Sequence, residues 1–176
     1  MITPLYYTTE RLPHGWIAAT CSEQGITQLS PPCDSQELAL SSLRILPATS
    51  SHRANKFVPF IQELTLFLDG KIAQFSSPID LPTGPLFFRE VWDTCRTIPY
   101  GETRTYSWLA STAGSPNASR AVGQAMARNP LPILVPCHRV LRSSGHLGGY
   151  AWGPDVKAWL LAIEKTNRGH LSHYAS

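Results

Sequence analysis

The sequence is poor in charged residues and has no long apolar run. Only 15% of its 176 residues are charged and 43% are apolar. This balance excludes a disordered chain and supplies enough apolar surface for a core. No apolar stretch approaches the roughly 20 residues that cross a membrane, and the first residues lack the pattern of a signal peptide. We therefore expect a cytoplasmic protein with one compact domain or two small ones.

Cysteine is scarce as well. Cys21, Cys33, Cys95 and Cys137 are widely and irregularly spaced. This spacing does not fit paired zinc ligands, and the cysteines are too sparse for a disulfide scaffold. We predict reduced thiols, no bound metal and no cofactor. Because most free cysteines are small buried hydrophobes, the question is whether one of them reacts.

The few charges are unevenly distributed. Residues 1–100 hold seven Lys or Arg and nine Asp or Glu, which gives a net charge of −2. Residues 101–176 hold eight Lys or Arg and three Asp or Glu, which gives a net charge of +5. A basic excess confined to one part of a chain indicates a polyanion partner, although a solvated surface is its more common meaning.

The N-terminal part reads as a small α/β unit. Paired strands are predicted at 16–21 and 26–29, joined by a turn at 22–25. Apolar spacing predicts helices at 35–44 and 57–68, and the polar residues 46–56 between them are expected to form a loop. This part holds no catalytic constellation and is interpreted as a scaffold.

A turn-rich stretch at 81–85 predicts a boundary between two domains, 1–83 and 84–176. Helices are expected at 87–98, 107–113 and 117–128, with Asn117 as the N-cap of the third. The two short helices indicate a helix-turn-helix motif. Small residues in the second would let it approach another surface closely, but tight packing within the domain explains them equally well. A last helix begins at Pro154, with a polar tail beyond Lys165 that is expected to fray.

Residues 129–140 hold three prolines among apolar residues, which predicts a rigid, extended and buried segment. Within it, Cys137 is followed by His138 and Arg139. A thiol becomes a nucleophile when nearby cations or a base lower its pKa. Adjacent side chains of an extended segment point to opposite faces, so Cys137 and His138 need a turn or a bridging water to communicate.

A histidine that acts as a base usually has a carboxylate to orient it. In the basic part of the chain the choices are Glu102, Asp155 and Glu164. Glu164 is expected near the end of the last helix, where the helix dipole makes a carboxylate slightly unfavourable. A solvated helix residue is the ordinary reading of such a position.

Several blocks together resemble one known family. They are IPYGETRTY at 98–106, SRAVG at 119–123, PCHRV at 136–140 preceded by Asn129-Pro130, GGY at 148–150, and KAWLL at 157–161. In this order they are similar to the O6-alkylguanine-DNA alkyltransferase family, over about residues 84–165. The resemblance implies an α+β protein, with a ribonuclease-H-like N-terminal domain and a winged-helix-like C-terminal domain.

The resemblance also implies a function, namely DNA repair by direct reversal of damage. Cys137 would take the alkyl group from O6-methylguanine, and also from O4-methylthymine, after the base is flipped out of duplex DNA. Alkylcysteine is a stable thioether, so each molecule would act once. The protein is expected to bind the minor groove as a monomer, with cooperative assembly on DNA as a further option.

Individual roles follow from the same resemblance. Glu164 would orient His138, which would activate Cys137 through a water molecule. Asn129 would brace the turn around the cysteine against the helix-turn-helix. Tyr106 would protonate or hydrogen-bond the leaving guanine at N3, which makes the base a better leaving group.

Other residues are assigned to the base and to DNA. Main-chain groups of Cys137, Val140 and Ala151 would read the base edge, in a pocket completed by Tyr150 and Trp152. Ala151 replaces a serine and Trp152 a glycine of some relatives, and the large indole predicts that methyl is preferred over benzyl. In the second short helix, Arg120 would fill the space left by the flipped base, and Ala118, Ser119 and Gly123 would allow close contact with the minor groove.

Three other functions compete with this one. Alkyltransferase-like proteins bind lesions without efficient transfer and lack the nucleophile, so the presence of Cys137 argues against them. A thiol hydrolase would use Cys137 and His138, but no other part of the chain suggests a peptide or ester site. A helix-turn-helix regulator would need a dimerisation segment or sensor domain, and none is evident.

Overall fold

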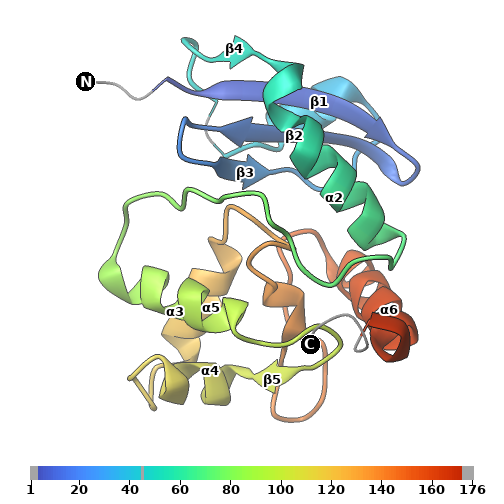
Figure 1. The fold of residues 1–176 in the computed structure, drawn as a ribbon. Helices are drawn as coiled ribbons and strands as arrows, with labels where there is room; N and C mark the ends of the chain where they lie inside the picture. The colour runs from blue at the N-terminus through green and yellow to red at the C-terminus, as the bar shows by residue number, and fades with distance from the viewer. Residues whose placement is uncertain (1–3, 45, 172–176) are drawn as a thin grey trace. The chain divides into compact units, whose positions relative to one another are not determined.

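The computed structural model describes residues 4–44 and 46–171. The chain divides into two compact units. The first unit comprises residues up to 66 together with 75–82, and the second comprises 67–74 and the chain from 83 onward. Both contain helices and strands, which makes the protein α+β (Figure 1).

The first unit is built on a mixed four-stranded sheet in the order β3-β2-β1-β4. Its strands are β1 (Tyr6–Leu12), β2 (Gly15–Cys21), β3 (Ile26–Leu29) and β4 (Ser51–His52). Strands β1 and β3 are each antiparallel to β2, and β4 runs parallel to β1. The two predicted strands and the turn between them are confirmed, with the Ser22 amide donating to the Gly25 carbonyl at 2.9 Å.

Two strands differ from the sequence interpretation. Strand β1 was not predicted, because its central Thr8-Thr9-Glu10 gives little apolar alternation. Strand β4 lies in the segment expected to be a loop and consists of two polar residues that pair with the start of β1. A strand this short has no periodicity from which it could be detected.

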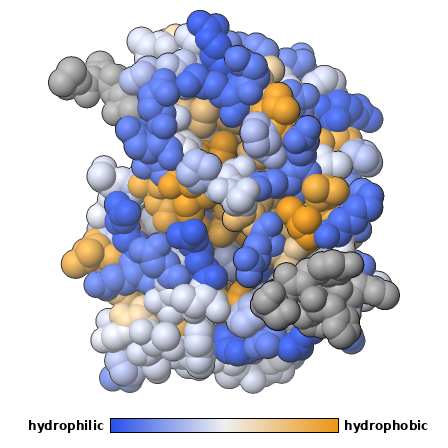
Figure 2. Space-filling view, viewed as in Figure 1, coloured by the Kyte–Doolittle hydropathy of each residue, from blue (hydrophilic) through white to orange (hydrophobic). Residues whose placement is uncertain are grey.

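Two helices complete the first unit, except that the last two residues of the second helix belong to the second unit. Helix α1 (Gln36–Ser41) begins at Ser35, whose hydroxyl accepts from the Leu38 amide at 3.2 Å. Helix α2 (Val58–Leu68) follows the 3-10 turn η1 (Ala54–Phe57). Both predicted helices are confirmed, with α1 shorter than expected. Their inward residues are buried, as in a unit with its own core. The face of the molecule drawn in Figure 2 is mostly hydrophilic, with apolar residues gathered in a few patches.

The second unit is mainly helical. It contains α3 (Leu86–Arg96), β5 (Arg104–Thr105), α4 (Tyr106–Thr112), α5 (Ser119–Ala127), the 3-10 turn η2 (Cys137–Arg139), β6 (Val140–Leu141) and α6 (Pro154–Leu171). Helices α3, α4 and α5 pack against one another, and β5 pairs with β6 in parallel. The indole of Trp92 on α3 donates to the Ala125 carbonyl on α5 at 2.9 Å. The three predicted helices are confirmed within a few residues.

Three expectations for this unit were wrong. Asn117 is not the N-cap of α5, because Ala118 holds that position, one residue later, and makes no side-chain capping bond. The chain does not leave the helix after Lys165, since α6 continues to Leu171 and Glu164 therefore lies well inside it. The segment 129–140 is buried as predicted, but Cys137–Arg139 turn as a 3-10 helix instead of extending. Within the described ranges, no helix has the length and apolar character needed to span a membrane.

Candidate active site

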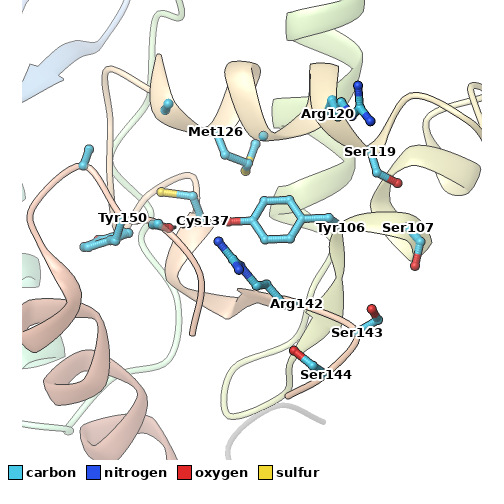
Figure 3. A pocket seen from close by; sticks show the side chains of 14 residues that line it. Tyr106, Ser107, Ser119, Arg120, Met126, Cys137, Arg142, Ser143, Ser144 and Tyr150 are labelled. Atoms are coloured by element: carbon cyan, nitrogen blue, oxygen red, sulfur yellow. Dashed lines mark hydrogen bonds between the residues drawn. The ribbon is translucent and has the colours of Figure 1, made fainter. Parts of the chain in front are cut away.

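Cys137 lies at the start of η2 and lines a pocket of about 730 Å³ (Figure 3). Its side chain is only 4% exposed. The walls come from α4, α5 and the loop that follows β6. The lining residues are Tyr106, Ser107, Ser119, Arg120, Gly123, Met126, Ala127, Arg142, Ser143, Ser144, Gly149, Tyr150 and Ala151.

The turn before the cysteine is organised by one buried amide. Asn129 donates from Nδ2 to the Val135 carbonyl at 2.9 Å and to Cys137 Sγ at 3.0 Å, and its Oδ1 accepts from the Leu131 amide at 2.9 Å. Its own amide donates to Met126 at the end of α5 at 3.2 Å. Inside this turn Ile133 has a φ of +78°, an unfavourable conformation for a β-branched residue. Asn129 thus connects α5, the strained turn and the sulfur.

A buried ionic cluster lies next to the cysteine in sequence. His138 Nε2 is 2.6 Å from Glu164 Oε1. Arg139 donates to the same carboxylate at 2.9–3.1 Å and to the Ile98 carbonyl at 2.7 Å. The Gly101 amide donates to Glu164 Oε2 at 2.9 Å. Both oxygens of Glu164 are therefore satisfied without water, as a buried carboxylate requires.

These contacts set the charges of the cluster. Burial alone would raise the pKa of Glu164, but hydrogen bonds and opposite charges from His138 and Arg139 outweigh it and lower that pKa to about 2. Burial lowers the pKa of His138, despite the opposing effect of Glu164. At neutral pH, Glu164 is therefore ionised and His138 is neutral, with its proton on Nε2 toward the carboxylate. Nδ1 is left as an acceptor and has no hydrogen-bond partner in the part of the chain that the structure describes.

The sulfur is held as a thiol. Burial raises the pKa of Cys137 to about 11, although the Asn129 hydrogen bond and the Lys157 charge act in the opposite direction. A thiol is a poor nucleophile, so the proton must leave as the cysteine reacts. The neighbouring neutral histidine has a free ring nitrogen that can accept it.

A buried lysine supports the other side of the turn. Lys157 on α6 is fully buried and donates from Nζ to the carbonyls of Val140, at 2.7 Å, and Leu147. Burial lowers its pKa to about 8. The buried face of α6 therefore consists of Lys157, Leu160 and Glu164, not of the apolar residues alone. This face connects the helix to both sides of Cys137.

Tyr106 is the first residue of α4 and points into the pocket toward Cys137 (Figure 3). Its hydroxyl donates to the Gly149 carbonyl at 3.4 Å. Burial raises its pKa, so the hydroxyl keeps its proton at neutral pH. It is placed to donate a hydrogen bond to a molecule bound beside the thiol.

The structure distributes the predicted site residues over three places. Seven of them line the pocket, namely Cys137, Tyr106, Ser119, Arg120, Gly123, Tyr150 and Ala151. Asn129, His138 and Glu164 lie behind the thiol. Ala118 is not in the lining. Val140 is buried, with its amide bonded to the Cys137 carbonyl and its own carbonyl to Lys157. Trp152 packs edge-on against Tyr150, with 6.0 Å between ring centroids, and is outside the lining.

The sequence interpretation missed several lining residues. Met126 lies three residues after Gly123 on the same face of α5, a spacing that could have indicated it. Arg142, Ser143 and Ser144 come from the loop after β6, and no local pattern places that loop at the pocket. Among the described residues, no three His, Cys, Asp or Glu side chains gather as metal ligands would.

The site consists of a buried cysteine that lines a pocket and is followed in sequence by a neutral histidine. This arrangement is typical of a protein that uses a thiol for chemistry. Residues 86–166 match the family described as 6-O-methylguanine DNA methyltransferase, DNA binding domain. The chain is 38% identical to the methylated-DNA–protein-cysteine methyltransferase of Methanosarcina barkeri, over 93% of this chain and 99% of the other. It is 39% identical to the constitutive Bacillus subtilis enzyme of that name, over 91% of this chain and 95% of the other.

Solved structures agree with these relatives. The Mycobacterium tuberculosis protein crystallised in complex with DNA is 33% identical, with a TM-score of 0.80, over 92% of this chain and 94% of the other. The chain belongs to the methylated-DNA–protein-cysteine methyltransferase family.

Proposed function

We propose that this protein repairs DNA directly, by moving an alkyl group from O6 of a damaged guanine to Cys137. The observation that carries the proposal is the position of the sulfur, which lines the pocket in contact with Asn129 and precedes the buried His138–Glu164 pair. The relatives are named for the same transfer, from methylated DNA to a protein cysteine.

The chemistry balances with the groups at the site. The thiol proton passes through a water molecule to Nδ1 of His138, while Glu164 holds the ring and stabilises the charge that forms on it. The sulfur then forms a bond to the alkyl carbon as the bond from that carbon to O6 breaks. The electron pair stays on guanine, which takes a proton at N3 from Tyr106. Tyr106 then regains a proton from solvent and His138 releases one to solvent, so the proton lost by the thiol equals the proton gained by guanine. The thioether is stable, so the protein acts once.

DNA binding is assigned to α5 and the pocket rim. Arg120 lies at the rim (Figure 3) and would occupy the position of the flipped base. Ala118, Ser119 and Gly123 would let α5 approach the minor groove, and the basic balance of this part of the chain would attract phosphates. We propose a monomer that acts on O6-methylguanine first and O4-methylthymine second.

The two-domain organisation is part of the same proposal. Residues 84–176 would form the winged-helix-like domain, supported by the packed helices α3, α4 and α5 and by the paired strands β5 and β6. Residues 1–83 would form a ribonuclease-H-like scaffold, supported by the mixed sheet. A protein of this kind would work in the cytoplasm, in association with the nucleoid if its source is a prokaryote.

The proposal is tested with a duplex that carries one O6-methylguanine. The unmodified chain should convert that base to guanine with a stoichiometry near one per protein, and Cys137→Ala should abolish conversion while retaining affinity for the duplex. Binding without conversion by the unmodified chain would identify a lesion-binding protein instead. We also propose that methyl is preferred over benzyl, because the Trp152 indole packs against Tyr150 of the pocket wall. Equal rates with the methyl and benzyl adducts would contradict this preference.

A further inference from the structure

The pocket has an excess of positive charge that its own lining does not neutralise. Arg120 and Arg142 both line it, and none of the lining residues is Asp or Glu. Several other arginines of the second unit pair with carboxylates, for example Arg104 with Glu102 at 2.7 Å and Arg96 with Asp93 at 3.8 Å. In the described ranges the Arg142 side chain has neither a hydrogen bond nor an ion pair, although its backbone amide donates to the His146 carbonyl at 3.0 Å.

The two pocket arginines point differently. Figure 3 shows Arg120 directed away from the thiol, whereas the Arg142 guanidinium extends toward Cys137 and the Tyr106 hydroxyl. Gly148 lies beside both side chains. A Cβ at this glycine would be in van der Waals contact with both, at 3.4 Å from Arg142 Cγ and from the Tyr106 hydroxyl. The mechanism proposed above uses Arg120 and leaves Arg142 without a role.

We propose that Arg142 binds an anion in the alkyl-transfer pocket. The inference rests on the proposed function, because that function places a substrate there. One source of the anion is a carboxylate at the end of the O6 substituent, as in O6-carboxymethylguanine. The carbon that Cys137 attacks must lie next to the sulfur, so any group attached to that carbon lies within the pocket. There the Arg142 guanidinium can bind a carboxylate with two parallel hydrogen bonds. The other source is a phosphate of the bound strand.

Transfer of such a group balances as the methyl transfer does. The bond between Cys137 Sγ and the methylene carbon forms, and the bond from that carbon to O6 breaks with its electron pair going to guanine. The proton that leaves the thiol is matched by the proton that guanine gains. The carboxylate keeps its charge throughout, and no further reactant is needed.

The test compares two free bases of the same size, O6-carboxymethylguanine and O6-carbamoylmethylguanine, which differ in charge and contain no phosphate. Arg142→Gln should weaken binding and transfer of the carboxymethyl base about tenfold and leave the carbamoylmethyl base unchanged. Arg142→Lys should restore part of the loss. Arg96→Gln, which removes an arginine outside the pocket, serves as the matched control.

The same variants on duplex DNA distinguish the two sources. If Arg142 binds phosphate, Arg142→Gln should weaken every duplex equally and lower the salt dependence of binding by about one unit of slope, with both free bases unaffected. If neither the charged base nor the duplex responds to Arg142→Gln, the inference is wrong. Binding measured in the Cys137→Ala background does not depend on transfer, so failure of the proposed function would be seen separately, as absence of methyl transfer by the unmodified chain.

Discussion

The two units bury different kinds of polar residue. Those of the first unit are all hydroxyl side chains, namely Thr8, Thr9, Thr20, Ser22 and Ser30. Those of the second unit are an amide and four ionisable groups, namely Asn129, His138, Arg139, Lys157 and Glu164. The first unit keeps its ion pair Lys56–Glu23 at the surface, with side chains 35% and 51% exposed. Burying a charge costs far more than burying a hydroxyl.

This difference suits the first unit to a structural role and the second unit to a reactive site. Buried ion pairs contribute little net stability, and well-packed apolar residues in their place are often as stable or more so. The buried charges of the second unit include His138, which directly follows Cys137, its partner Glu164, and Lys157, whose charge acts on the thiol. We therefore interpret them as groups that position Cys137 and receive its proton, while the first unit is free to be an ordinary folded domain.

The largest effect is expected from Glu164→Gln. The substitution leaves the Arg139 guanidinium buried without a counter-charge, so the free energy of unfolding should fall by about 3–5 kcal/mol in a urea titration. Glu102→Gln is the matched control, because Glu102 also pairs with arginines but is 27% exposed, and it should cost at most about 1 kcal/mol. Equal losses for the two variants would erase the distinction between buried and surface charge.

The buried cluster of Glu164, His138 and Arg139 should also make the stability of the protein depend on pH. The pKa of Glu164 is lowered in the folded state to about 2, so its contribution is present above the unfolded pKa and is lost as pH falls from about 4.5 toward 2. This contribution is about 3 kcal/mol. The pKa of His138 is also lowered in the folded state, so stability falls further as the pH drops below about 6.5. Urea midpoints across this range should fall steeply for the unmodified chain, and a parallel curve for Glu164→Gln would contradict the assignment.

Tyr106→Phe should lower the rate of alkyl transfer about a hundredfold, because the leaving guanine loses its proton donor. The fold should be unaffected, since the lost hydrogen bond to Gly149 is long, at 3.4 Å. Single-turnover rates and duplex affinity are measured on the same preparations. A loss of affinity that accounts for the whole change in rate would assign Tyr106 to binding instead of proton donation.

The smallest effect is expected in the first unit. Lys56→Gln removes the exposed partner of Glu23, and such pairs contribute little to stability. The transition temperature and the transfer rate should both match those of the unmodified chain. A clear loss of transfer in this variant would show that the first unit takes part in the site.

Local patterns predicted most of the helices, because apolar spacing acts within a few residues. These patterns failed where an element is very short or where the interacting residues are far apart in the sequence. Strand β4 pairs only two residues, and the N-cap of α5 shifted by one residue from Asn117. The partnership of His138 and Glu164 spans 26 residues of sequence, and only the family resemblance indicated it. The role of Arg139 in the same cluster, and the place of Arg142 in the pocket, could be found only from the folded chain.

The most direct test of the central claim is to locate the transferred group. After reaction with a duplex containing O6-methylguanine, peptide mass analysis should find one added methyl group, on Cys137, in nearly every protein molecule. Cys21, Cys33 and Cys95 should be unmodified. Methylation of another residue, or repeated turnover that leaves Cys137 unchanged, would contradict the claim.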